Sequence, residues 1–167
     1  QASKINENVN AIVLTDPTLV EQYKTQIGSN IKIHLIEDKI NFSDFKDDNL
    51  NIIPIKLKNQ IKFGSPDVKN FSFVKSSIVT ATNLYMNSIA DAIVTNPINK
   101  NMMHRSGLNF QGHTDFLSSL SLKKKNPVMM LVTKELKTLP LTIHVPLKKV
   151  AKLITKELIL TKVKVAA

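Results

Sequence analysis

The sequence contains no cysteine and no tryptophan, few glycines, and no long apolar run. Without cysteine, the chain forms no disulfides, thiolate metal sites or cysteine nucleophiles. Its four glycines are too scattered for a glycine-rich phosphate loop, so no nucleotide is expected to bind in the Rossmann manner. No apolar run approaches the roughly 20 residues that span a bilayer, and residues 1–4 begin no signal sequence. We therefore expect a soluble protein of the cytoplasm without a membrane partner.

Positive charge, by contrast, is plentiful, with a net charge of +10. The segment from Lys123 to Lys164 alone holds eleven lysines against two glutamates, a net +9. These lysines are dispersed, and no aromatic residues alternate with them as on a surface that binds single-stranded nucleic acid. The pattern favours a solvated face and predicts no nucleic-acid partner. A non-catalytic basic binding domain that uses this segment remains the alternative.

The first ninety residues alternate between short apolar runs and amphipathic segments. The runs predict strands at 11–15, 31–36 and 51–57, the last at a sheet edge because it contains a proline. Helices are predicted from Asp16-Pro17 to about residue 26 and at 73–90, where apolar residues recur every three or four positions.

The alternation continues to the end of the chain. Strands are predicted at 92–95, 128–132 and 139–143, and a short helix at 98–103. A second helix is predicted to run through residues 116–120 with Thr114 or Asp115 as its cap, and a third to begin at Pro146. Alternating strands and helices predict an α/β fold with a mixed sheet flanked by helices. We expect residues 1–167 to form one domain, or two small lobes.

Two of the four histidines stand at the edges of predicted elements. His113 lies at a predicted helix start, and His144 follows a predicted strand and precedes a proline. A helix start suits an anion, although a capping or packing role explains His113 equally well. His34 and His104 are interpreted as structural residues.

Four blocks of residues, in order along the chain, resemble the signatures of 4-hydroxythreonine-4-phosphate dehydrogenases. A weaker similarity reaches back to residues 13–17, so the resemblance covers roughly residues 10–160. Because the four blocks occur in the same order, they are far more specific together than any one alone. The blocks are Asp91-Ala-Ile-Val-Thr-Asn-Pro-Ile-Asn-Lys100, Gly107-Leu-Asn-Phe-Gln-Gly-His-Thr-Asp-Phe-Leu117, Val128-Met-Met-Leu131 and Thr142-Ile-His-Val-Pro-Leu147.

The resemblance implies a fold similar to isocitrate and isopropylmalate dehydrogenases, and a homodimer with a divalent metal site shared between subunits. It also implies a step of pyridoxal phosphate synthesis, in which NAD or NADP oxidises the alcohol of 4-phosphohydroxy-L-threonine. Decarboxylation then gives 3-amino-2-oxopropyl phosphate, and the metal polarises the reacting oxygen. A related dehydrogenase acting on D-threonate or D-erythronate 4-phosphate is the alternative within the same reaction class.

The resemblance assigns roles to a few residues. His113 and Thr114 match the family's substrate-binding pair, and His144 matches one of three metal-binding histidines. Lys100 is a candidate phosphate ligand, against the alternative of an ordinary surface lysine. The metal is expected to be Zn, Co, Mn or Mg, although magnesium prefers oxygen ligands. The sequence identifies neither the catalytic base nor the residues that bind the cofactor.

The chain also departs from the family's pattern. Asn96 stands where the family usually has glycine between threonine and proline. The family's members are about twice as long, and their Gly-Asp-Pro-Ala-Gly-Ile-Gly-Pro block and their other metal histidines have no counterpart here. We therefore interpret residues 1–167 as a partial α/β domain. On its own it is expected to bind metal and NAD poorly and to be inactive.

Overall fold

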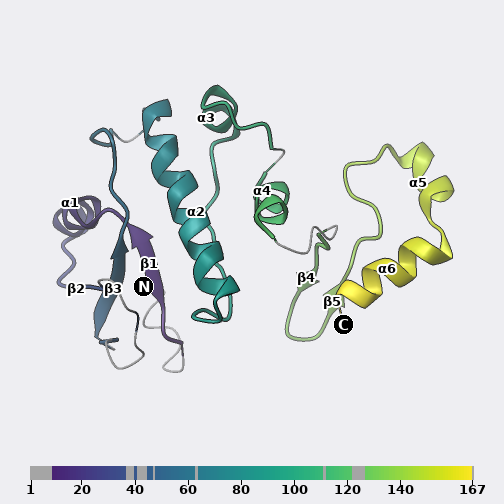
Figure 1. Cartoon of the computed structure of the whole chain (residues 1–167), viewed down its shortest axis with the longest axis horizontal. Helices are drawn as coiled ribbons and strands as arrows, with labels where there is room; N and C mark the ends of the chain where they lie inside the picture. Colours follow the sequence, from purple (N-terminus) through teal and green to yellow (C-terminus); the bar gives the residue numbers. More distant parts are fainter. Residues whose placement is uncertain are drawn as a thin grey trace. The chain divides into compact units, whose positions relative to one another are not determined.

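A computed structural model of the chain describes residues 9–36, 40, 45–46, 48–62, 64–110, 112–121 and 127–166. The chain divides into two compact units, residues 1–120 and 121–167. Figure 1 shows the strands and helices of each unit along the chain. The two units are treated separately below.

The first unit is built on a parallel sheet with the strand order β1-β3-β2. Strands β1 (Ile12–Thr15) and β2 (Lys32–Leu35) each pair with β3 (Asn49–Pro54), so that Ile52 lies opposite both Val13 and Leu35. Ile52 is completely buried, as expected for the middle of a central strand. Helices with a parallel sheet confirm the α/β class, and the strands predicted at 11–15 and 31–36 are confirmed. The predicted mixed sheet is not found among the described strands, because all three strands of this sheet are parallel and the antiparallel strands of the second unit form a separate sheet.

The prediction that residues 51–57 form an edge strand is wrong. Strand β3 is the central strand of its sheet, with partners on both sides. Pro54 is tolerated because it is the last residue of the strand, so its missing N–H does not interrupt the ladder. Beyond it, the N–H of Ile55 donates to the carbonyl of Thr15 at 3.0 Å.

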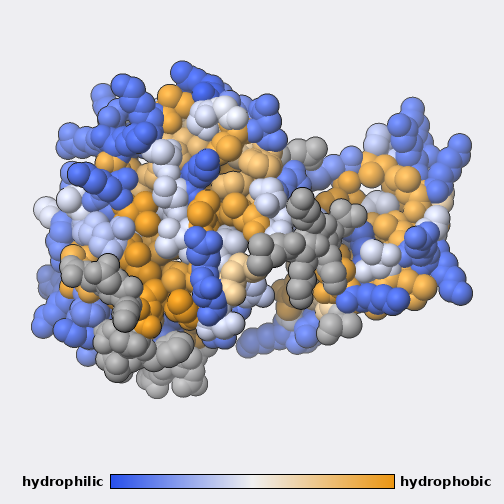
Figure 2. Space-filling model, in the orientation of Figure 1, coloured by the Kyte–Doolittle hydropathy of each residue, from blue (hydrophilic) through white to orange (hydrophobic). Residues whose placement is uncertain are grey.

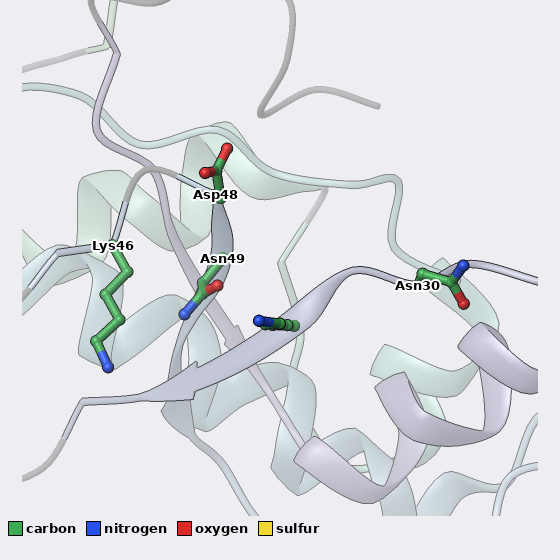
Figure 3. Close-up of a pocket in the computed structure, with 5 residues that line it drawn as sticks. Asn30, Lys46, Asp48 and Asn49 are labelled. Atoms are coloured by element: carbon green, nitrogen blue, oxygen red, sulfur yellow. The ribbon is translucent and has the colours of Figure 1, made fainter.

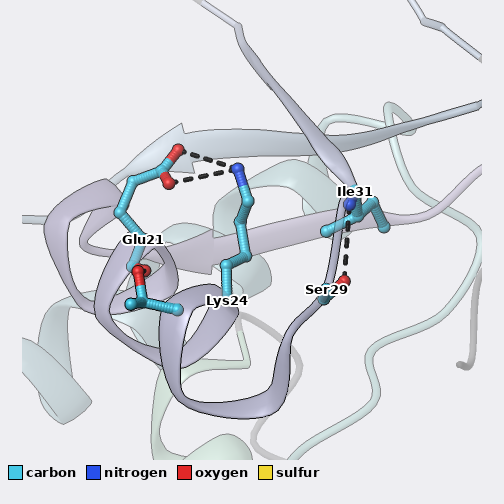
Figure 4. Close-up of polar contacts among 5 residues, drawn as sticks. Glu21, Lys24, Ser29 and Ile31 are labelled. Atoms are coloured by element: carbon cyan, nitrogen blue, oxygen red, sulfur yellow. Dashed lines mark hydrogen bonds and ion pairs between the residues drawn. The ribbon is translucent and has the colours of Figure 1, made fainter.

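Helix α1 (Pro17–Ile27) follows β1 directly and has well-defined ends. Asp16 caps its first turn, with Oδ1 accepting from the backbone N–H and the hydroxyl of Thr18. At the other end, Gly28 adopts a left-handed conformation with φ of 63° and donates its N–H to the carbonyl of Lys24. Figure 4 shows the Nζ of Lys24 between both carboxylate oxygens of Glu21, each at 3.1 Å. Because this pair is exposed, it adds little stability.

Helix α2 (Phe71–Met86) follows the short 3-10 helix η3 (Val68–Asn70) and lies beside β1. It buries Phe71, Ile78 and Thr82, and the hydroxyl of Thr82 donates to the carbonyl of Ile78 at 2.8 Å. The buried positions recur every four to seven residues, which confirms the helix predicted from the apolar stripe.

Two short helices complete the first unit. Helix α3 (Lys100–Arg105) is followed by Gly107, which has a φ of 87° as expected for a residue that ends a helix. Helix α4 (His113–Leu120) begins two or three residues earlier than predicted, because the carbonyl of Gly112 already accepts from the N–H of Phe116. The strand predicted at 92–95 is wrong: no described segment pairs with these residues, and Val94 is 95% exposed.

The second unit differs more from the prediction. Strands β4 (Leu131–Val132) and β5 (Lys137–Thr138) form a short antiparallel pair, so the strand predicted at 139–143 is wrong and the one at 128–132 is only partly formed. The predicted helix from Pro146 is divided into α5 (Leu147–Leu153) and α6 (Lys156–Ala166). Ile154 is extended, and the hydroxyl of Thr155 accepts from the N–H of Leu158 at 3.1 Å. Thr155 therefore caps a new helix instead of continuing the old one.

Apolar and hydrophilic residues are mixed over the surface of both units (Figure 2). Among the helices of the described ranges, none combines the length and the hydropathy that crossing a membrane would require. The lysine-rich segment 123–164 is described from residue 127 onward, and its first three lysines lie outside the described residues.

We predict that Asp16 stabilises the first unit through two elements at once. Besides capping α1, its Oδ2 accepts from the N–H of Leu57 at 2.8 Å, so the Asp16→Ala change removes a cap and leaves a partly buried donor unpaired. Chemical denaturation followed by circular dichroism should show a loss of about 2 kcal/mol. The control is Asp67→Ala, which removes the exposed cap of η3 and should lower the stability less than Asp16→Ala does. Equal losses would contradict this account.

The contribution of Asp16 should also depend on pH. Burial by itself raises the pKa of Asp16, but hydrogen bonds from Leu57 and Thr18 outweigh it and hold the pKa below its ordinary value of 3.8. A lowered pKa means that the stabilisation is complete above the unfolded pKa of about 3.9 and is lost as the pH falls through the folded value. The stability difference between the chain and Asp16→Asn should therefore shrink below about pH 4. A constant difference down to pH 2 would be incompatible with this linkage.

Candidate functional site

The site predicted around His113 rests on an apolar cluster between helices α2 and α3. Phe71, Met102 and Met103 are buried together at its centre. Five partly buried apolar residues pack against them: Val68, Val74, Ile98, Leu108 and Phe110. The cluster holds α3 against η3 and the start of α2, and so fixes where the first residue of α3 lies.

Helix α4 is held in place by an aromatic contact. The rings of Phe110 and Phe116 lie with centroids 5.1 Å apart and a tilt of 36°, and Phe116 is only 4% exposed. Aromatic pairs in such geometry contribute about 1 kcal/mol beyond the area that they bury. Because Phe110 belongs to the cluster and Phe116 to α4, this contact ties the start of α4 to α3.

The two anchored helix starts lie next to each other. The Cε of Lys100, the first residue of α3, lies 3.9 Å from the position that a Cβ on Gly112 would occupy. Gly112 is the residue before α4, so the stem of Lys100 passes the beginning of that helix. Asn99 fixes the start of α3, because its side chain accepts from the N–H of Met102 at 3.1 Å.

His113 supplies the most informative polar atom of the site. Its Nε2 is buried and has no hydrogen-bond partner among the residues that the structure describes. Buried polar atoms are nearly always paired, so an imidazole nitrogen without a partner among the described residues marks a position where a further hydrogen-bonding group is expected. Thr114, the next residue, is exposed and carries a hydroxyl on the same first turn.

Together these groups form an arrangement suited to an anion. The stem of Lys100 passes a helix start that carries the imidazole of His113 and the hydroxyl of Thr114, and free backbone N–H groups at a helix start favour negative charge. The structure thus places the stem of Lys100 beside Gly112, the residue before the His113-Thr114 pair that the sequence singled out. Gln111 of the same block lies outside the described residues.

His144 belongs to the second unit, and its surroundings differ from the prediction. It does not end a strand, but lies exposed in the connection before α5, with a φ of 56°. Left-handed backbone is uncommon for a residue other than glycine and costs about 1 kcal/mol or more. Among the described residues, no group of three or more histidine, aspartate or glutamate side chains is placed to hold a metal. His144 therefore does not form a metal site with the rest of the described chain.

A hollow elsewhere in the first unit is a weaker candidate. It is lined by Asn30, Lys32, Lys46, Asp48 and Asn49. Lys46 and Asp48 point away from each other there (Figure 3). Lys32 and Asn49 are the first residues of β2 and β3, so the hollow lies at the amino ends of parallel strands. Open sheets of this class bind ligands at the opposite, carboxyl ends.

Comparison with known proteins decides the family. The sequence profile described as "Pyridoxal phosphate biosynthetic protein PdxA" matches residues 7–167. The chain belongs to the PdxA family. This membership confirms the resemblance inferred from the four sequence blocks, two of which contain Lys100 and the His113-Thr114 pair.

Curated relatives of the family are enzymes, and they are much longer. The 4-hydroxythreonine-4-phosphate dehydrogenase of Wigglesworthia glossinidia brevipalpis is 32% identical over 148 residues, which are 89% of this chain and 44% of that protein. The enzyme of the same name from Methylorubrum populi is 32% identical over 153 residues, with 88% and 44% covered. The chain thus spans less than half the length of these PdxA relatives.

Solved PdxA-type structures share the fold. The 4-hydroxythreonine-4-phosphate dehydrogenase of Klebsiella pneumoniae superposes with a TM-score of 0.79 at 23% identity, over 93% of this chain and 48% of that one. The enzyme from Burkholderia phymatum gives a TM-score of 0.78 at 24% identity, over 92% and 46%. Because both structures are less than 25% identical to this chain, the comparison establishes a shared fold and no more.

Sequence reasoning missed the residues that hold the candidate site together. The stem of Lys100 lies beside Gly112, and the contact of Phe110 with Phe116 places α4. The six-residue spacing of the two phenylalanines on either side of a glycine is a signal that was present in the sequence. The spacing alone does not show that the two rings touch, because that contact depends on the path of the backbone between them.

We predict that Phe116 holds α4 in place. Phe116→Ala removes a buried ring and should lower the free energy of unfolding by about 3 kcal/mol. Phe116→Leu keeps most of the apolar volume and should cost less than about 1.5 kcal/mol. Denaturation curves of both variants provide the measurement. A loss below about 1 kcal/mol for Phe116→Ala would show that the ring contact does not anchor the helix.

Proposed function

We propose that this chain provides the phosphate-binding part of a 4-hydroxythreonine-4-phosphate dehydrogenase in pyridoxal phosphate biosynthesis. The proposed reaction is the oxidation and decarboxylation of 4-phosphohydroxy-L-threonine with NAD or NADP and a divalent metal. We further propose a homodimer in the cytoplasm, whose subunits share the metal site in a fold similar to isocitrate dehydrogenase. Membership of the PdxA family supports the reaction class, and the site geometry supports the substrate's phosphate end.

One observation carries the proposal: Nε2 of His113 is buried without a hydrogen-bond partner among the described residues, at a helix start that the stem of Lys100 passes. A phosphate presents several acceptor oxygens and a double negative charge near neutral pH. Three hydrogen-bond donors match such a group: the imidazole N–H of His113, the hydroxyl of Thr114 and the ammonium group of Lys100. The ammonium group of Lys100 and the start of α4 both attract negative charge, so their contributions to binding a phosphate reinforce each other.

In this proposal, the chain's own residues bind and orient the substrate. Lys100 neutralises the phosphate charge, His113 donates one hydrogen bond from its Nε2, and Thr114 donates another from its hydroxyl. Holding the phosphate end fixes the distance from that end to the carbon that is oxidised, which reduces the entropy cost of reaching the reactive geometry.

The described residues do not by themselves fit the metal or the nucleotide. A metal would polarise the reacting oxygen and stabilise the charge left by decarboxylation, and the nucleotide would accept a hydride. His144 is one histidine, whereas a stable metal site needs several ligands supported by further hydrogen bonds. We therefore assign no catalytic step to the metal or the nucleotide on this chain.

The phosphate site does not distinguish among four-carbon phosphates. D-threonate and D-erythronate 4-phosphates carry the same terminal group, and they differ from 4-phosphohydroxy-L-threonine at the substituent on carbon 2. A titration panel with all three compounds therefore separates phosphate binding, common to all, from substrate preference.

We predict that removing the lysine charge weakens binding of 4-phosphohydroxy-L-threonine. Lys100→Met keeps a long apolar stem but loses the ammonium group, and isothermal titration calorimetry should show at least tenfold weaker binding, as expected for a charge-assisted contact. His113→Phe, which keeps a ring without donors, should weaken binding to a similar extent. The matched control is Lys75→Met on the exposed part of α2, which should leave the affinity unchanged. Equal effects of Lys75→Met and Lys100→Met would contradict the site.

We also predict that the 167-residue chain alone does not reduce NAD or NADP in the presence of substrate and Zn²⁺, Mn²⁺ or Mg²⁺. The reason is the lack of a multidentate metal site among its described residues. The measurement is absorbance at the wavelength of the reduced nucleotide, with a full-length PdxA relative as the positive control. Metal-dependent turnover by the purified chain would overturn this prediction.

A further inference from the structure

Helix α3 begins with Lys100, and two kinds of contact hold its first turn. The side chains of Met102 and Met103 are buried with Phe71 in the apolar cluster. Asn99, the residue before the helix, accepts two hydrogen bonds from the same two methionines. Its side chain accepts from the N–H of Met102 at 3.1 Å, and its carbonyl accepts from the N–H of Met103 at 3.0 Å. Asn99 therefore closes the turn that carries Lys100.

The cap of Asn99 is important because α3 is short. A helix of six residues has little stability of its own, and without a cap its first residue is the first to leave the helical conformation. In α3 that residue is Lys100, whose stem lies beside Gly112. Met102 and Met103 are held in the cluster by their own apolar contacts. Loss of the cap should therefore change the direction of Lys100 and leave the fold in place.

The chemical type of the cap also matters for a site that binds an anion. Asparagine, serine and aspartate cap helices about equally well, and the charge of aspartate is further favoured at a helix start. An aspartate at position 99 would nevertheless stand directly before Lys100, where it would attract the ammonium group and repel a phosphate. The neutral side chain of Asn99 provides the cap without this repulsion.

We propose that Asn99 is a positioning residue of the phosphate site. By capping α3 it holds Lys100 beside the start of α4, and as a neutral group it does not repel the ligand. Asn99 acts through Lys100 and is not itself a contact of the phosphate. This inference rests on the proposed function, in which Lys100 binds the phosphate of 4-phosphohydroxy-L-threonine.

A double-mutant cycle between Asn99 and Lys100 tests the inference. Isothermal titration calorimetry with 4-phosphohydroxy-L-threonine compares the 167-residue chain with Asn99→Ala, Lys100→Met and the double variant. Asn99→Ala should weaken binding about fivefold, as expected for the loss of a helix cap, but less than about twofold when residue 100 is already methionine. An equal effect in both backgrounds would overturn the inference and leave the phosphate site standing. An unchanged affinity of Lys100→Met would overturn the phosphate site itself, and this inference with it.

Two other substitutions at position 99 separate the cap from its charge. Asn99→Ser keeps a neutral cap and should retain the affinity to within about twofold. Asn99→Asp keeps the cap and the stability against denaturant, but it should weaken binding at least about fivefold, and added salt should reduce this loss. A purely structural role would leave Asn99→Asp with full affinity, and that result would contradict the inference.

Thr155→Ala in the second unit is the matched control. The hydroxyl of Thr155 accepts from the N–H of Leu158 at 3.1 Å, so it caps α6 with the same spacing and distance as Asn99 caps α3. Its loss should leave the affinity unchanged, and circular dichroism checks that every variant folds. Equal weakening by Thr155→Ala and Asn99→Ala would overturn the inference, because the loss of any helix cap would then suffice.

Discussion

The candidate site depends on the packing of Phe71 with Met102 and Met103. This cluster fixes α3 against α2, and through the contact of Phe110 with Phe116 it also fixes α4. Helices of six and eight residues are too short to be stable alone, so their positions come from this packing. The polar groups at their starts are held in a defined geometry by apolar residues that never touch a ligand. A change in the cluster should therefore affect the site as strongly as a change in the site itself.

Much of the first unit could be predicted from the sequence, because its signals are local. Asp16-Pro17 and Gly28 mark the ends of α1, and the spacing of apolar residues identifies α2. The errors concern long-range pairing. Whether Pro54 lies in an edge or a central strand depends on which strand pairs beside it, which no local pattern specifies. Residues 92–95 and 139–143 have the composition of buried strands, but a strand also needs a neighbour, and none pairs with them within the described residues.

The candidate site was also predictable only in part, because its sequence signals are local whereas its contacts join distant residues. The sequence singled out His113 and Thr114. Only the structure shows that Nε2 of His113 is buried without a partner in the described part of the chain, and that the stem of Lys100 passes Gly112. The two units have opposite characters. The first has a buried core and carries the polar groups that we propose bind a phosphate, whereas the second has exposed apolar residues and a left-handed backbone at His144. This contrast is consistent with a chain that spans less than half the length of its PdxA relatives.

The most direct test of the central claim is a nuclear magnetic resonance titration of the chain, labelled at its four histidines, with 4-phosphohydroxy-L-threonine. Our account predicts that the imidazole signal of His113 moves and saturates, because its Nε2 acquires a phosphate partner, while those of His34, His104 and His144 stay in place. Equal movement of all four signals, or a fixed His113 signal while another histidine responds, would contradict a phosphate site at the start of α4.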